Sequence, residues 1–206
     1  MVAAFGGVYG LVNNVGIGGP PGTALDVDPD GWDLGMQVNV KSMMLTAKSC
    51  LPHMIAASSG SIVNMSSVAG LKGGIPHLLY PTSKAAIIGL TRAMAAHHGA
   101  DGIRVNCIAP GMVYTPMVAS LGMTSETREA RQRQSLLGTE GTGWDVGAAV
   151  RFLLSDEARW ITGVTLPVDA GASAGSRSYP TLPPPVATAA ADPCAQRRAA
   201  DAGGRT

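Results

Sequence analysis

The stretch Ser61-Ile-Val-Asn-Met-Ser-Ser67 is the part of this 206-residue chain that decides its fold class. Its first five residues predict a strand, which ends at two serines. The long Ala-rich segment Pro81–His98 predicts a helix, because Pro81 suits the first turn of a helix and Gly99 suits its end. A strand followed by such a helix indicates one unit of a parallel sheet.

The alternation of strands and helices continues upstream of this unit. The apolar run Val8–Asn13 predicts a buried parallel strand that feeds a Gly-rich loop. A helix is expected from Pro29 to about Val40, with Asp28 or Asp30 as its capping residue. A further helix is expected over Met43–Met54.

Downstream, strands are predicted over Ile103–Ile108 and Val164–Val168. Trp144–Leu154 predicts a short amphipathic helix, and the polar stretch Thr124–Gln134 predicts a solvated one. Strands and helices that alternate at this spacing indicate an α/β fold, with a parallel sheet covered by helices on both faces.

The chain divides into one domain, residues 1–175, and a disordered tail, residues 176–206. The last thirty residues, Arg177–Thr206, hold five prolines, many alanines and almost no large apolar side chains. Such a composition cannot bury enough apolar surface to fold, so no structure is expected in the tail.

Bulk composition excludes several classes of partner. Hydrophobic residues make up 46% of the chain, charged residues 14%, and the formal net charge is +1. This balance gives no electrostatic reason to bind nucleic acid or an anionic membrane. The N-terminus shows neither a secretory signal nor an apolar span. Three widely separated cysteines favour reduced thiols and a cytoplasmic location; they are Cys50, Cys107 and Cys194.

Tyr80 and Lys84 form the first candidate pair for chemistry. On a helix, residues four apart share a face, so the phenol and the ammonium can meet. A fixed positive charge favours the phenolate and is expected to lower the pKa of Tyr80 toward neutrality. Tyr80 could then act as a general acid or base. The alternative is an exposed tyrosine and lysine on a surface helix.

Ser67 is the candidate that gives this pair a context. It lies thirteen positions before Tyr80, at the carboxyl end of a predicted parallel strand. That end is where open α/β sheets bind ligands. Taken alone, a pair of serines is more often part of a loop or a helix cap. Spacing favours Ser67 over Ser66, which could line the pocket.

Six motifs occur in an order that resembles one protein family, over about residues 5–175. They are Asn13-Asn14-Val15-Gly16, Asn39 in Gln-Val-Asn-Val, Ser61–Ser67, Tyr80-Pro-Thr-Ser-Lys84, Arg104-Val-Asn-Cys-Ile-Ala-Pro-Gly111 and Ile161-Thr-Gly-Val. In this order they resemble the classical branch of the short-chain dehydrogenase/reductase family. The resemblance implies a Rossmann-like doubly wound parallel sheet.

The resemblance also implies roles for individual residues. Tyr80 would give a proton to a carbonyl oxygen or take it from an alcohol, and Ser67 would hold that oxygen by a hydrogen bond. Lys84 would lower the pKa of Tyr80 and bind the ribose hydroxyls of the cofactor. Asn39 would complete the catalytic set by fixing a water that links Lys84 to solvent.

NAD or NADP is the implied cofactor, and the choice between the two cannot be read from the sequence. The turn with Asn13 and Gly16 would stabilise the central strand and contact the adenosine side of the cofactor. The segment from Pro110 and Gly111 would contact the nicotinamide carboxamide, through the backbone of Val113 and the hydroxyl of Thr115. Tyr80 and Lys84 would complete the cofactor contacts.

One family motif is missing from the sequence. The Gly-rich turn T-G-x-x-x-G-x-G does not occur, and Gly16-Ile-Gly18-Gly19 does not fit a phosphate-binding pattern. Aligned on its motifs, the chain corresponds to strands four to seven of the family sheet. We therefore expect an N-terminally truncated family member, in which Val8–Asn13 becomes an edge strand.

Two functions are compatible with these observations. The first is an NAD(P)-dependent oxidoreductase that interconverts a secondary alcohol and a ketone by hydride transfer. The alternative is an inactive truncated fragment that acts only as an interaction or oligomerisation module. Family members associate through helices that match Met43–Met54 and Pro81–His98, so the intact form is expected to be a homodimer or homotetramer.

The substrate cannot be read from the sequence beyond a small alcohol or ketone. Its determinants are expected in the loop from Met112 to about Leu137. His77 is a candidate for the substrate mouth, although a histidine in a loop can also be incidental. His53, His97 and His98 have no acidic or cysteine partners at metal-ligand spacing, so no metal is predicted.

Overall fold

The computed structural model describes residues 2–120 and 122–175. Four parallel strands form one sheet in the order β1 (Gly10–Asn13), β2 (Gly60–Met65), β3 (Ile103–Pro110) and β6 (Thr165–Val168). The four strands predicted from the sequence are all present. Strand β1 forms one edge of this sheet, as expected for Val8–Asn13.

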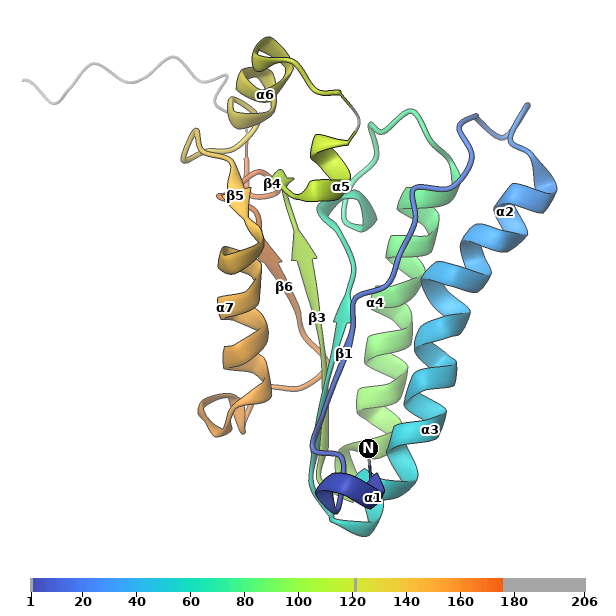
Figure 1. Cartoon of the computed structure of the whole chain (residues 1–206), viewed down its shortest axis with the longest axis vertical. Helices are drawn as coiled ribbons and strands as arrows, with labels where there is room; N and C mark the ends of the chain where they lie inside the picture. Colours follow the sequence, from blue (N-terminus) through green and yellow to red (C-terminus); the bar gives the residue numbers. More distant parts are fainter. Residues whose placement is uncertain (1, 121, 176–206) are drawn as a thin grey trace, which may run out of the picture.

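Helices cover both faces of the sheet (Figure 1). One face is covered by α3 (Ser42–Ala56) and α4 (Leu79–His98), and the opposite face by α7 (Gly143–Leu154). Each of these helices leads from one strand to a parallel neighbour. The predicted α/β, doubly wound fold is confirmed.

Alternate side chains of the central strands enter two different cores, as expected for a pleated strand. Ile62 of β2 packs with Met54, Met94 and Val105 beneath α3 and α4. Val63, the next residue, faces the α7 side. There it lies in a second core that also contains Met65, Ile108, Val146, Leu153 and Ala158.

The helices predicted over Pro29 to about Val40 and over Met43–Met54 form one continuous helix in the structure. Helix α2 (Pro29–Met36) passes through a π-helical turn, Gln37–Lys41, directly into α3. Asp28 caps the start, because its carboxylate accepts from the backbone N–H of Gly31 at 2.7 Å. The expected break is absent since Lys41 and Ser42 keep right-handed helical geometry.

Helix α4 begins at Leu79, two residues before the predicted start at Pro81. The earlier start is possible because the first four N–H groups of a helix have no partner inside it, so proline loses no bond there. Tyr80 therefore lies in the first turn. Helix α4 ends at His98 as predicted, but the left-handed residue that turns the chain into β3 is Gly102, not Gly99.

The carboxyl ends of the strands carry a set of short elements that the sequence pattern did not predict (Figure 1). They include a two-stranded parallel pair, β4 (Val113–Tyr114) with β5 (Gly141–Thr142), and helix α5 (Pro116–Ala119). Helix α6 (Ser125–Gln132) corresponds to the predicted Thr124–Gln134. A short N-terminal helix, α1 (Val2–Phe5), lies at the opposite end of the molecule.

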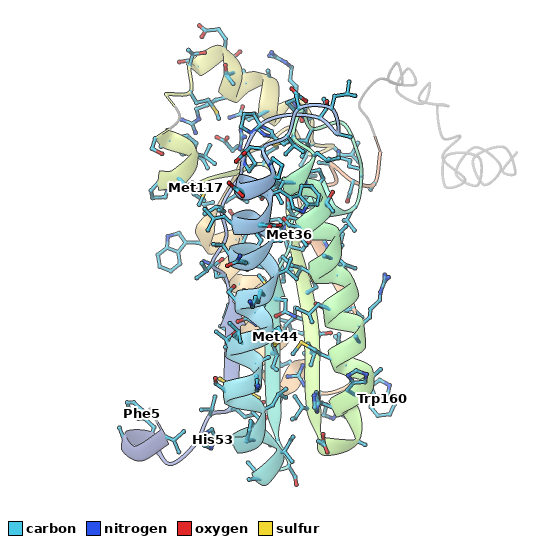
Figure 2. The ribbon with its side chains drawn as sticks, turned by 90° about the vertical axis from the view of Figure 1, so that its right-hand side faces the viewer. Phe5, Met36, Met44, His53, Met117 and Trp160 are labelled. Carbon is cyan, nitrogen blue, oxygen red and sulfur yellow. The ribbon has the colours of Figure 1, made fainter. Side chains whose placement is uncertain are left out.

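The predicted disordered tail, residues 176–206, lies outside the residues that the structure describes. Over the described part of the chain, no helix is both long enough and apolar enough to cross a membrane. Figure 2 shows the layer formed by α2, α3 and α4, where Met36 and Met44 lie on the side facing the viewer.

Candidate active site

Ser67 and Tyr80 meet where β2 ends and α4 begins. Ser67 follows β2 with an extended backbone, and its hydroxyl accepts from the N–H of Ala69 at 3.1 Å. The Tyr80 phenol lies near Ser67, whose side chain acts to lower the pKa of the phenol. Burial raises the pKa of Tyr80, and the effect of Ser67 only partly offsets this rise. The sequence-based expectation of a lowered Tyr80 pKa is therefore wrong for this structure, since burial outweighs the effect of Ser67.

Lys84 lies one turn after Tyr80 on α4, as the spacing predicts. Its ammonium nitrogen is 5.5 Å from the centre of the Tyr80 ring. The residue is only 5% exposed, and Nζ donates to the backbone oxygen of Met65 at 3.1 Å. Burial lowers the pKa of Lys84 to about 8. The alternative of an exposed tyrosine and lysine on a surface helix is excluded.

Ser66 has a different environment from Ser67. It is buried, and its hydroxyl donates to the backbone oxygen of Lys84 at 2.7 Å. Its N–H donates to the backbone oxygen of Ile108. Ser66 thus fixes the start of α4 against the ends of β2 and β3, whereas Ser67 lies near the phenol of Tyr80. Ser67, rather than Ser66, therefore stays the candidate serine of the site.

Asn39 lies in the π-helical turn and is completely buried. Its amide nitrogen donates to the backbone oxygen of Ile17 at 3.0 Å and to the hydroxyl of Ser83 at 2.9 Å. Its amide oxygen accepts from the N–H of Ile17 at 2.8 Å. π-Helical turns are frequent at functional sites. Here the turn lets Asn39 clamp the loop after β1 against α4.

Gly16 borders both Asn39 and Lys84. A Cβ atom at this position would lie 3.3 Å from Nζ of Lys84 and 3.4 Å from the side-chain oxygen of Asn39. The structure therefore brings together five of the predicted site residues, which come from segments far apart in the sequence. They are Gly16, Asn39, Ser67, Tyr80 and Lys84.

Asn13 belongs to a separate buried network that braces the strands. Its side-chain nitrogen donates to the side-chain oxygen of Asn64 at 2.8 Å, and its oxygen accepts from the hydroxyl of Thr46 at 2.6 Å. Asn64 in turn donates to the hydroxyl of Thr91 at 3.0 Å. Sequence reasoning missed Asn64. A polar amide inside a predicted buried strand was the available signal, because such groups need partners.

The segment after β3 is held closely against β6. Gly111 donates its N–H to the backbone oxygen of Val168 at 3.0 Å, and a Cβ atom there would lie 2.6 Å from that of Asp169. Pro110 is the last residue of β3. The N–H of Val113 donates to the oxygen of Gly111, so that amide already has a partner.

Thr115 is the N-cap of α5, and its hydroxyl accepts from the N–H of Val118 at 3.3 Å. A hydroxyl that accepts one bond keeps its own proton for donation. Thr115 can therefore still serve a ligand. The predicted cofactor contact through Thr115 is compatible with this arrangement.

His77 lies in the loop before α4, where its backbone pairs with Gly22. Its ring atom Nδ1 is buried and has no hydrogen-bond partner among the described residues. His97 and His98 lie at the end of α4, and His98 contacts Asp101 at 3.0 Å. Within residues 2–120 and 122–175, no cluster of three or more His, Cys, Asp or Glu side chains could hold a metal.

Comparison with known families agrees with this geometry. A family model described as enoyl-(acyl carrier protein) reductase matches residues 1–173 of the chain. This chain belongs to the short-chain dehydrogenase/reductase family. The family is one of oxidoreductases, and the resemblance noted from the six motifs is confirmed.

Curated relatives match most of the chain. It is 41% identical over 173 residues to 2-(S)-hydroxypropyl-CoM dehydrogenase 3 of Xanthobacter autotrophicus (strain ATCC BAA-1158 / Py2), covering 82% of this chain and 68% of the relative. It is 37% identical to cis-4-hydroxycyclohexanecarboxylate dehydrogenase of Sinomonas cyclohexanicum, covering 84% and 68%. The chain thus spans about two thirds of the length of these relatives.

Solved structures share the fold of this chain. ElxO with NADP bound superposes with a TM-score of 0.79 at 31% identity, covering 84% of this chain and 71% of that one. A short-chain type dehydrogenase/reductase from Mycobacterium ulcerans gives a TM-score of 0.80 at 30% identity, covering 85% and 64%.

Proposed function

We propose that the domain over residues 1–175 is the catalytic part of an NAD- or NADP-dependent oxidoreductase that interconverts a secondary alcohol and a ketone. The observation that carries this proposal is the half-buried Tyr80 phenol near Ser67, with the ammonium nitrogen of Lys84 5.5 Å from the centre of its ring. Relatives named as dehydrogenases of hydroxylated compounds support the reaction class.

Lys84 has the donor capacity that a nucleotide ribose requires. An ammonium group has three N–H donors, and the structure uses one of them on the oxygen of Met65. The remaining donors lie beside Gly16, where the lack of a side chain leaves room. Thr115 keeps a hydroxyl proton for the nicotinamide side. These residues fit the cofactor that the family implies.

NAD or NADP bound there would supply or accept the hydride. The NADP-bound structure of ElxO supports a nicotinamide cofactor, while the choice between the two forms stays open.

Tyr80 is the proposed proton carrier. A tyrosine is a neutral phenol at neutral pH, and burial raises the pKa of Tyr80 further, so that Tyr80 can donate its proton to the carbonyl oxygen of a ketone. The Ser67 hydroxyl would hold that oxygen and stabilise its developing charge. In the reverse direction, Tyr80 must first lose its proton, which the charged form of Lys84 favours.

Asn39 is proposed to act by positioning. Both N–H bonds of its amide are engaged with Ile17 and Ser83, so its side chain sets where Gly16 and Lys84 meet. Fixing a water that links Lys84 to solvent remains part of the proposal. Within the described residues, Cys50 and Cys107 form no disulfide. The cytoplasmic location stays a proposal from the sequence.

Replacing Tyr80 by phenylalanine tests the acid/base role. The rate of ketone-dependent NADPH or NADH oxidation, followed by nicotinamide absorbance over a panel of ketones, is expected to fall about 10²–10⁴-fold, as for loss of a general acid. Tyr9→Phe removes a hydroxyl from an exposed tyrosine and is the matched control. A Tyr80→Phe rate within a few fold of the wild type would exclude the assignment.

Association without catalysis is the second candidate, and one surface feature favours it. A shallow hollow of about 470 Å³ lies over α2, α3 and α4, where Met36, Val40, Met44 and Leu90 supply apolar lining and Asp33, Gln37 and Lys41 supply polar lining. The resemblance to the family implies association through α3 and α4, which lie with α2 in the layer that faces the viewer in Figure 2. Sizing chromatography of the chain mixed with a full-length relative tests this association. If the chain is inactive and also elutes separately from the relative, association without catalysis is ruled out.

A further inference from the structure

Helix α6 lies above the carboxyl ends of the sheet strands, on the same side as α5 and the start of α4 (Figure 1). It is eight residues long and buries none of its side chains. A helix this short is unstable in water on its own, and apolar packing normally supplies the missing stability. Something other than a hydrophobic face must therefore hold α6 in place.

Arg128 and Arg131 supply that attachment. They are three positions apart, so both project from one face of α6. Both converge on Glu140: Nε and Nη2 of Arg128 donate to Oε2 at 3.0 and 2.8 Å, and Nε of Arg131 donates to Oε1 at 3.3 Å. The side chain of Glu140 is only 3% exposed. Within the described structure, Arg128 and Arg131 are the residues of α6 whose side chains bond to a distant part of the chain.

The same arginines also contact β4. The guanidinium of Arg128 stacks on the Tyr114 ring at 3.8 Å from its centre, and Nη2 of Arg131 donates to the backbone oxygen of Val113 at 3.4 Å. Val113 pairs with Gly141 of β5, which directly follows Glu140. Thr115 directly follows Tyr114. One buried carboxylate thus ties α6 to the strand that leads into Thr115.

A third ion pair, between Glu129 of α6 and Arg133 just after it, is an ordinary surface contact. Arg133 and Glu129 approach to 3.5 Å, but their side chains are 67% and 66% exposed. Exposed pairs of this kind contribute little to stability. A carboxylate that is nearly buried and accepts from two guanidinium groups is held much more strongly.

We propose that Glu140 is a positioning residue, which holds α6 against β4 through Arg128 and Arg131 and thereby fixes β4 and Thr115. The effect on cofactor and substrate rests on the proposed function. The tether itself does not, because it follows from contacts among residues of this chain alone.

Three single variants test the tether. Glu140→Gln removes the buried charge, and Arg131→Gln removes one partner from a helix without buried residues, so the latter leaves the core intact. Glu129→Gln makes the same chemical change as Glu140→Gln on an exposed pair and is the matched control. Hydrogen exchange of the amides in α6 and tryptic cleavage after Arg128 are measured on each full-length variant.

The rates of amide exchange and of cleavage are expected to rise about tenfold in Glu140→Gln and in Arg131→Gln, because each variant loses charge-assisted hydrogen bonds that hold α6. Glu129→Gln should match the wild type. If both test variants exchange and are cleaved at the rate of Glu129→Gln, Glu140 does not hold α6 and the proposal is wrong.

Kinetics separate positioning from a general loss of structure. In Arg131→Gln, KM for ketone and for NADPH should rise, while kcat stays within about threefold, because the reacting groups Ser67, Tyr80 and Lys84 are untouched. A fall in kcat with unchanged KM would overturn the link to Thr115. If the wild type oxidises no nicotinamide, the proposed function fails, and exchange and cleavage still decide the tether.

Discussion

Replacing Asn64 by alanine is expected to destabilise the protein more than replacing any surface asparagine by alanine. Asn64 is completely buried in β2, where it accepts from Asn13 and donates to Thr91. Its side chain therefore connects β1, β2 and α4 by hydrogen bonds. Alanine keeps the strand but removes both bonds at once.

The magnitude follows from which partners lose their bonds. The amide nitrogen of Asn13 is left without its acceptor inside the protein, which costs about 1–3 kcal/mol. The hydroxyl of Thr91 still donates to the backbone oxygen of Ile87 at 2.8 Å, so its loss is smaller. The small cavity left by the missing side chain adds to the cost of the unpaired Asn13 amide. The free energy of unfolding should therefore fall by about 2–4 kcal/mol in total.

Urea unfolding followed by far-ultraviolet circular dichroism measures this change. Asn14→Ala is the control, because Asn14 is the exposed neighbour of Asn13 and should change the free energy of unfolding by less than about 0.5 kcal/mol. If Asn64→Ala unfolds within that same margin of the wild type, the buried amide network contributes nothing and the reasoning fails.

Two further predictions concern Lys84 and Gly70. The pKa of Lys84 is lowered to about 8 in the folded protein, so between pH 8 and the unfolded value of 10.5 the unfolded state binds more protons. The free energy of unfolding should therefore rise with pH above 8, by at most about 1.4 kcal/mol per pH unit. Lys84→Met should abolish this rise. A wild-type free energy of unfolding that falls from pH 8 to 9.5 would contradict the prediction. At Gly70, an added Cβ would lie 2.6 Å from the carbonyl carbon of Lys84, so Gly70→Ala should cost about 1–3 kcal/mol and shift Ser67. Gly73→Ala, where a Cβ meets nothing within 4 Å, is the control in the same melting and activity assays, and equal behaviour of the two variants would refute this prediction.

The strands, the main helices and the meeting of Tyr80 with Lys84 could be predicted from the sequence, because each follows from local spacing. Residues four apart on a helix share a face whatever the rest of the chain does. The parallel sheet follows from the alternation of strands and helices. Ser67 could be placed because the carboxyl ends of parallel strands lie at one edge of the sheet.

The features that the sequence did not reveal depend on contacts between distant residues. Arg128 and Glu140 lie in a polar stretch with no hydrophobic period, so the composition there indicated only a solvated helix. The continuity of α2 with α3 depends on the π-helical turn at Asn39, which has no local signature. The raised pKa of Tyr80 reflects its burial beneath other elements, and spacing along one helix does not report burial.

The attachment of α6 has a practical consequence for enzyme engineering. Since the helix buries no side chain, its exposed positions can be randomised together with little loss of folding stability. A combinatorial library that keeps Arg128, Arg131 and Glu140 and varies the exposed positions would sample new surfaces in the segment from Met112 to about Leu137, where the substrate determinants are expected. These positions are Ser125, Glu126, Thr127, Glu129 and Ala130. Substrate preference in this fold could thus be evolved on a helix that the hydrophobic core does not constrain.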